Sequence, residues 1–211
     1  MKIKLKQKLK MSKEKPKLII IADPNGSGKT SVTGKILEHN WIEGCVYINP
    51  DNIARDEFGD WNSPVAVLKA AIRAEDIREQ CLKQRTGILF ETVLSSPEKI
   101  EFIKRAKDSG YFIRLFFVGT DNPTINAGRI VRRVMEGGHD VPIPKIISRF
   151  SKSIANCCNV ACLVDRLYVY DNSVDFAEPK LLFRAVNGKL EKAYSDVNLW
   201  AQNIFNSLIN S

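Results

Sequence analysis

The chain has 211 residues, of which 44% are hydrophobic and 27% charged, and this composition is that of one ordinary globular domain. Residues 1–17 hold eight lysines and one glutamate and supply most of the net charge of +8. The rest of the chain has 24 basic and 23 acidic residues and is nearly neutral, which argues against nucleic-acid binding. No apolar run approaches the roughly 18 residues of a membrane-spanning helix, and the charged N-terminus lacks the apolar region of a signal peptide.

Residues 1–16 differ from the rest of the chain because lysine alternates with apolar residues in M-K-I-K-L-K-Q-K-L-K. We expect a basic tail, either solvated or upstream of a start at Met11. Pairing at a sheet edge or binding to an anionic surface is the alternative. Residues 17–211 are expected to form a single domain. Because the five cysteines lack metal-ligand spacing, we expect a reducing, cytoplasmic setting.

Residues 18–31 read L-I-I-I-A-D-P-N-G-S-G-K-T-S, an apolar strand, a turn of small residues and the start of a helix. This order is typical of a P-loop, whose backbone N–H groups surround a phosphate at the helix N-terminus. Lys29 is expected to reach the β- and γ-phosphates of ATP, and the Thr30 hydroxyl to ligate Mg²⁺. A glycine-rich turn that only links two elements is the alternative. The predicted nucleotide-binding residues here are Asn25, Gly26, Ser27, Gly28, Lys29, Thr30 and Ser31.

One position departs from the P-loop pattern G-x-x-x-x-G-K-[ST], because Asp23 stands where the first glycine belongs. A side chain there is strained if the corner needs a dihedral angle that only glycine adopts readily. Its carboxylate would also repel a triphosphate. The sequence therefore predicts weaker ATP binding and slower turnover than in an Asp23→Gly variant. A protein that binds a nucleotide without turnover is an alternative.

A second strand is expected over residues 45–48, followed by N-P-D. Asp51 is then placed to accept a proton from a nucleophile during phosphoryl transfer. Its structural alternative is the N-cap of a short helix over residues 53–58. A long amphipathic helix is expected over residues 64–85, since its apolar residues share one face.

The third strand, residues 88–92, places Glu91 and Thr92 at its C-terminal end. Glu91 follows an apolar run, so its burial is costly unless it binds a substrate hydroxyl, a backbone amide or Mg²⁺ through water. The residues alone leave open whether Asp51 or Glu91 serves the metal. A helix is expected from Pro97 to near Gly110, and a fourth strand over residues 111–118.

Two helices are then expected over residues 122–136 and 144–163, separated by G-G-H-D-V-P. They carry Arg129, Arg132, Arg133 and Arg149 on either side of the Gly137-Gly138 hinge. A hinged segment that carries arginines suits a lid, residues 122–163, which closes over the γ-phosphate and neutralises charge. A solvated basic helix face is the alternative.

A fifth strand over residues 166–170 precedes Asp171-Asn172-Ser173, where Asn172 either lines an adenine pocket or belongs to an Asx turn. Residues 180–193 predict a hairpin that turns at Asn187-Gly188, and residues 196–209 a final helix. Strands and helices thus alternate along the chain. This predicts an α/β fold of the P-loop NTPase, kinase-like type: a mainly parallel sheet with helices on both faces, ligands at the C-terminal ends of its strands and an arginine-bearing helical lid.

Taken in order, these motifs resemble the zeta-toxin family of P-loop kinases, over residues 17–173. The resemblance rests on P-N-G-S-G-K-T, N-P-D-N-I-A, F-E-T-V-L-S, R-R-V-M-E-G-G-H-D-V-P with I-I-S-R-F, and Y-D-N-S. It implies ATP-dependent phosphorylation of a sugar hydroxyl, best known on UDP-N-acetylglucosamine. It also implies that Lys29 and Thr30 hold ATP and Mg²⁺, and that a small antitoxin often keeps such proteins inactive.

The resemblance further implies roles for individual residues. Asp51 would be the general base, Arg133 the first lid arginine and Arg149 the second, with His139 the weaker candidate for the second. Glu75 lies sixteen residues before Glu91, at the spacing of a substrate-binding glutamate, although a solvated helix position is the alternative. With Thr92, these two glutamates form the predicted substrate site. Val93 and Ser95 stand where the family has threonine and arginine, a departure that bears on the sugar substrate.

The leading interpretation is a kinase for a small hydroxyl-bearing metabolite such as a nucleotide sugar. A nucleoside or nucleotide kinase shares the P-loop and the arginine lid, and is the second interpretation. A nucleic-acid-end kinase that uses the lysine tail is the least favoured, because the body is nearly neutral. No membrane partner is expected.

Overall fold

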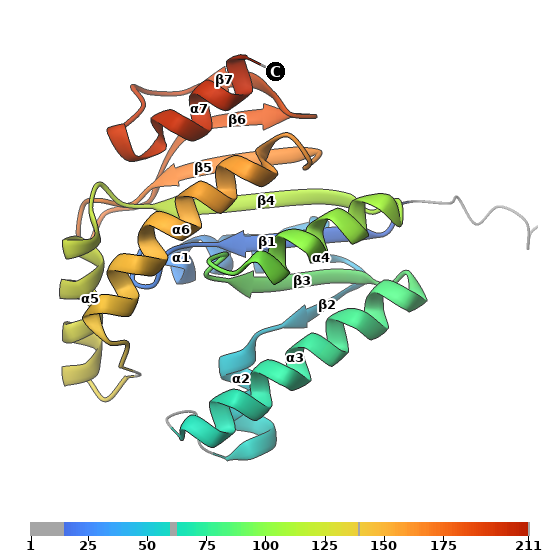
Figure 1. Cartoon of the computed structure of the whole chain (residues 1–211), viewed down its shortest axis with the longest axis vertical. Coiled ribbons are helices and arrows are strands. Elements are labelled where there is room, and N and C mark those ends of the chain that lie inside the picture. Colours follow the sequence, from blue (N-terminus) through green and yellow to red (C-terminus); the bar gives the residue numbers. More distant parts are fainter. Residues whose placement is uncertain (1–14, 60–62, 139, 211) are drawn as a thin grey trace, which may run out of the picture.

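The computed structural model of the chain describes residues 15–59, 63–138 and 140–210. The prediction of a basic tail falls almost wholly outside these residues, as does the candidate role of His139. The strands are β1 (Lys17–Ala22), β2 (Cys45–Ile48), β3 (Gly87–Thr92), β4 (Phe112–Gly119), β5 (Arg166–Asp171), β6 (Lys180–Val186) and β7 (Lys189–Ala193). They form one sheet in the order β2-β3-β1-β4-β5-β6-β7, shown in Figure 1.

The first five strands are parallel to one another, and β6 and β7 extend the sheet beyond β5 as an antiparallel hairpin. β1 is central, with Ile20 between Phe90 of β3 and Leu115 of β4. The residues of β1 from Leu18 to Ala22 are fully buried, as expected for a strand covered on both faces. Parallel pairing brings the C-terminal ends of β1 to β5 to one edge of the sheet, the edge that positions the site.

The helices are α1 (Lys29–Leu37), α2 (Pro50–Phe58), α3 (Pro64–Gln84), α4 (Pro97–Asp108), α5 (Pro123–Met135), α6 (Ile143–Ala161) and α7 (Gln202–Ile209), with the short 3₁₀ helices η2 (Asn40–Ile42) and η3 (Leu199–Ala201). Side chains of α3, α4, α6 and α7 pack with one face of the sheet in the larger core cluster. α1 and η2 cover part of the other face, over Ile19, Ile21 and Phe116. The predicted α/β class, with helices on both faces, is confirmed (Figure 1).

Two local predictions were wrong. The last helix was expected from residue 196, but the chain forms η3 first and α7 begins at Gln202. Trp200 of η3 is buried, packs near Phe117 and donates from its indole nitrogen to Asp171, so tertiary contacts decide this segment. The N-cap of α2 is not Asp51 but Asn49, whose side-chain oxygen accepts from the backbone N–H groups of Asp51 and Asn52.

In the part of the chain that the structure describes, no helix has both the length and the apolarity that crossing a bilayer requires.

Candidate active site

The loop between β1 and α1 has the backbone of a phosphate-binding loop. Gly26 and Gly28 have φ angles of +86° and +90°, which favour glycine. A Cβ atom on Gly26 would lie 2.6 Å from the Asn126 carbonyl oxygen, and one on Gly28 would lie 2.1 Å from Nδ2 of Asn172. The loop is therefore pressed against two neighbouring segments, and no side chain fits at either glycine.

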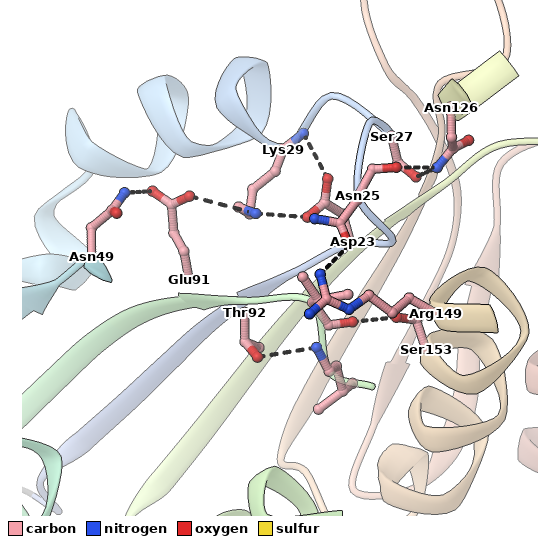
Figure 2. Close-up of polar contacts among 12 residues, drawn as sticks. Asp23, Asn25, Ser27, Lys29, Asn49, Glu91, Thr92, Asn126, Arg149 and Ser153 are labelled. Atoms are coloured by element: carbon pink, nitrogen blue, oxygen red, sulfur yellow. Dashed lines mark hydrogen bonds and ion pairs between the residues drawn. The ribbon is translucent and has the colours of Figure 1, made fainter. Parts of the chain in front are cut away.

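Two buried asparagines hold this loop in place. Asn126 of α5 donates from Nδ2 to the Asn25 carbonyl at 2.8 Å and to the Ser27 hydroxyl at 2.9 Å, contacts drawn in Figure 2. Asn172, after β5, donates from Nδ2 to the Ser27 carbonyl at 2.7 Å. Sequence reasoning offered an adenine pocket or an Asx turn for Asn172 and missed Asn126. Because Asn126 lies far from the glycine loop along the chain, no local motif marks it.

Replacing Asn126 by alanine is expected to lower stability by about 1–3 kcal/mol, because buried partners in the loop lose their hydrogen bonds. ATP affinity should fall with it, since the phosphate-binding loop loses its support. Chemical denaturation and ATP titration measure the two effects. Asn122→Ala is the matched control: it removes the N-cap of the same helix without touching the loop, so stability alone should fall. Equal loss of ATP affinity in both variants would contradict this role.

Asp23 lies inside the loop and binds the two groups that the motif assigns to phosphate. Its Oδ1 accepts from Lys29 Nζ at 2.7 Å and its Oδ2 from the Lys29 backbone N–H at 3.3 Å (Figure 2). The residue is 3% exposed. Asp23 does not have a positive φ angle, so the backbone strain considered for this corner is not present. Its carboxylate therefore engages both Lys29 groups that the P-loop motif assigns to phosphate.

The charges of this pair are tightly coupled. Burial raises the pKa of the Asp23 carboxyl above its ordinary value, against the opposing effect of Lys29. Burial lowers the pKa of Lys29, but Asp23 and Glu91 outweigh it and hold this pKa above its ordinary value. The raised pKa of Lys29 favours its ammonium form, and Asp23 is the acidic group closest to it, at 2.7 Å.

Glu91, at the end of β3, is the second carboxylate near Lys29, with 3.8 Å between Oε2 and Nζ. Its Oε1 accepts from the Tyr47 hydroxyl and, at 3.2 Å, from Asn49 Nδ2. Burial and the bond to Glu91 raise the pKa of Tyr47 to about 12, so the phenol stays a neutral donor at physiological pH. Sequence reasoning missed Tyr47 and Asn49. Both lie on or just after β2, which pairs with β3 and so brings them beside Glu91.

The other predicted acceptor-side residues are placed differently. Asp51 is exposed in the first turn of α2 and lies close enough to Lys29 to raise its pKa. Thr92 is buried, and its hydroxyl accepts from the backbone N–H of Leu94 at 3.0 Å, supporting a positive φ angle at that residue. Glu75 is exposed on α3, where it acts on the charges of Arg78 and Arg105. The structure thus brings Asp51 and Glu91 near the loop, while the described contacts of Glu75 lie with α3 and α4.

The four arginines also separate. Arg149 of α6 donates from Nη1 to Asn25 Oδ1 at 3.1 Å (Figure 2). Arg133 is exposed and packs against Gly138. Arg129 and Arg132 both pair with Asp175, in the segment between β5 and β6. Nη1 of Arg129 is buried without a hydrogen-bond partner among the described residues and lies 3.9 Å from where a Cβ atom of Gly28 would be.

The remaining predicted nucleotide-binding residues lie where α1 begins. Thr30 and Ser31 are exposed in its first turn. No group of three or more His, Cys, Asp or Glu side chains within the described ranges forms a metal site. Thr30 stands at the position where the P-loop motif has its hydroxyl for Mg²⁺.

A phosphate-binding loop at the C-terminal edge of a parallel sheet, with an arginine and two carboxylates around it, defines the P-loop kinase-like class of proteins. The chain belongs to the zeta toxin family, whose model matches residues 2–177. It is 31% identical over 123 residues to an uncharacterized protein of Haemophilus influenzae, covering 58% of this chain and 84% of that protein.

Solved structures show the same fold at low identity. A structure of AvrRxo1-ORF1:-ORF2 with ATP has a TM-score of 0.66 and 16% identity, and covers 92% of this chain and 63% of that one. A structure from the PezAT chromosomal toxin–antitoxin system of Streptococcus pneumoniae has a TM-score of 0.60 and 14% identity, and covers 97% and 83%. This chain thus spans less than two thirds of the AvrRxo1 chain.

Proposed function

We propose that this protein is an ATP-dependent phosphotransferase that transfers the γ-phosphoryl group to a hydroxyl of a small metabolite. The observation that carries the proposal is the pair of donors on Lys29, its backbone N–H and its ammonium, which hold a carboxylate at 3.3 and 2.7 Å. A loop that binds one oxyanion through these groups has the donors that a phosphate needs. Membership of the zeta toxin family and the kinase-like fold support the same reaction.

The proposed roles follow from position. The donors of residues 25–31 would bind the triphosphate, and Thr30 would ligate the Mg²⁺ that accompanies it and neutralises its charge. Asp51 would accept the proton of the attacking hydroxyl, because it is exposed near Lys29 and Asn49 already supplies the helix cap. Glu91, oriented by Tyr47 and Asn49, would bind the acceptor hydroxyl.

Residues 122–163 are proposed to act as the lid, with Arg149 neutralising charge on the transferred group and Arg133 reaching it on closure. For Arg149→Gln we expect kcat to fall at least about tenfold, with a smaller change in ATP affinity. Steady-state kinetics test this. Lys145→Gln, an exposed change on the same helix, is the control and should leave kcat unaltered. Equal rates for the two variants would contradict the role.

For the acceptor we propose a nucleotide sugar, with UDP-N-acetylglucosamine as the first candidate, because the resemblance to zeta toxins includes the motifs around Asp51 and Glu91. Val93 and Ser95 replace the threonine and arginine of the family, so a nucleoside is the second candidate. Relatives in the solved structures occur in a toxin–antitoxin system and in a two-protein complex, and we propose an inhibitory protein partner for this chain too.

A second candidate function is nucleotide binding without turnover, which the Asp23–Lys29 pair favours. One assay separates the two. The chain and its Asp23→Gly variant are incubated with ATP, Mg²⁺ and a panel of nucleotide sugars and nucleosides, and products are analysed by mass spectrometry. We expect ADP and one acceptor heavier by a phosphate, faster with the variant. ATP binding without any product from either chain would instead support the silent nucleotide-binding protein.

A further inference from the structure

A cavity of about 220 Å³ lies beside α1, against the face of β4 and β5 that α1 covers only in part. Five aromatic rings line it, those of His39, Trp41, Phe116, Tyr168 and Tyr170. The Phe116 and Tyr168 rings are stacked, with centroids 4.8 Å apart and planes 8° apart, and Trp41 stacks on both. Flat aromatic walls of this kind favour a planar ring as the ligand. We call this cavity the aromatic pocket.

The aromatic pocket begins where the phosphate-binding loop ends. Ser31, two residues after Lys29, lines it together with Pro179. Close by, Arg129 Nη1 is buried without a hydrogen-bond partner among the described residues, 3.9 Å from a Cβ position on Gly28. A buried guanidinium nitrogen that lacks an acceptor is costly unless a ligand supplies one. A nucleotide that binds its phosphates at the loop and extends into the aromatic pocket would therefore lie next to Arg129 and Ser31.

The segment between β5 and β6 lies next to the aromatic pocket and is held by ion pairs to α1 and to α5. Glu178 forms an ion pair with Lys35 of α1, and Asp175 pairs with Arg129 and Arg132 of α5. These contacts hold Pro179 at the wall of the pocket without a ligand. A pocket that is already formed loses less conformational entropy when a ligand binds.

We propose that the aromatic pocket binds the base of the donor nucleotide, with Arg129 on its phosphates. This inference rests on the proposed function and adds the residues that recognise the donor. Because aromatic and aliphatic side chains form most of the lining, stacking on the aromatic rings would provide most of the affinity for the base. Every base can stack in this way, so the Kd values of ATP and GTP should lie within about fivefold of each other.

The test compares ligands with and without a base. Tyr170→Leu should raise the Kd of ATP and of GTP about 5- to 30-fold, because a stacking surface is lost, and should leave the Kd of inorganic tripolyphosphate unchanged. Tyr168→Leu, which removes the ring stacked on Phe116, is the second variant should the first fail to fold. Tyr194→Leu is the matched control, because Tyr194 is a 43% exposed tyrosine that directly follows β7 and does not line the pocket. It should change the Kd of neither ATP nor tripolyphosphate.

Three outcomes would contradict the account, each at a different claim. If neither pocket variant changes the Kd of ATP or of tripolyphosphate, the base does not bind in the aromatic pocket. The proposed function would be unaffected by that result. If neither ATP nor tripolyphosphate binds, in this chain or in Asp23→Gly, the proposed function fails and this inference with it. A preference for one of the two nucleotides well above tenfold would also contradict recognition by stacking alone.

Discussion

Asp23→Gly is expected to bind ATP at least about tenfold more tightly than the unaltered chain and to turn over faster. A buried carboxylate 2.7 Å from Lys29 Nζ competes with the β- and γ-phosphates for that ammonium and repels their charge. Once it is removed, Glu91 at 3.8 Å is the ion-pair partner that Lys29 keeps among the described residues, and the ammonium is freer to bind phosphate. Titration of both chains with ATP and Mg²⁺ gives the ratio of the two dissociation constants.

Asp23→Asn is the matched control for that change. It keeps the size of the side chain and removes its charge, so it should recover much of the gain if charge is the cause. Because Asp23 does not have a positive φ angle, we expect little of the gain to come from the freedom of glycine. Equal ATP affinities for the unaltered chain and Asp23→Gly would show that the carboxylate moves away at no cost, and would contradict competition between Asp23 and phosphate for Lys29.

The second large effect is expected at Asp51. Asp51→Asn should lower kcat about 10²- to 10⁴-fold and leave the Kd of ATP nearly unchanged, because a general base acts on the acceptor hydroxyl. The kinetics are best measured in the Asp23→Gly background, where turnover is expected to be faster. Asn49 supplies the cap of α2 in either case, so the helix should not be affected.

Asp56→Asn is the control for this loss, since Asp56 is an exposed carboxylate of the same helix that pairs with Arg55. Its kcat should equal that of the parent. Glu91→Gln tests the competing assignment. If Asp51→Asn stays active and Glu91→Gln loses more kcat than Asp51→Asn does, Glu91 is the general base.

The sheet and most helices could be predicted from the sequence because their signals are local. The apolar run of β1, the proline that opens α4 and the Asn187-Gly188 turn each determine their element within a few residues. The final helix was predicted too early because the burial of Trp200, a tertiary contact, decides where α7 begins.

The site was predictable only in part, for the same reason. The loop residues and Asp51 follow from motif spacing, whereas the support by Asn126 and the bond of Tyr47 to Glu91 depend on elements far apart in the chain. Asp23 is intermediate between these cases. Its place in the motif could be predicted from the sequence, but its two hydrogen bonds to Lys29 depend on how the loop folds.

A crystal structure of Asp23→Gly grown with Mg²⁺ and a non-hydrolysable ATP analogue tests the central claim most directly. We predict a triphosphate in the loop of residues 25–31, Lys29 Nζ on its oxygens and Thr30 facing the metal. An empty loop at millimolar concentrations of the analogue, with Lys29 bound to Glu91 instead, would contradict the claim that this loop is a nucleotide site blocked by one carboxylate.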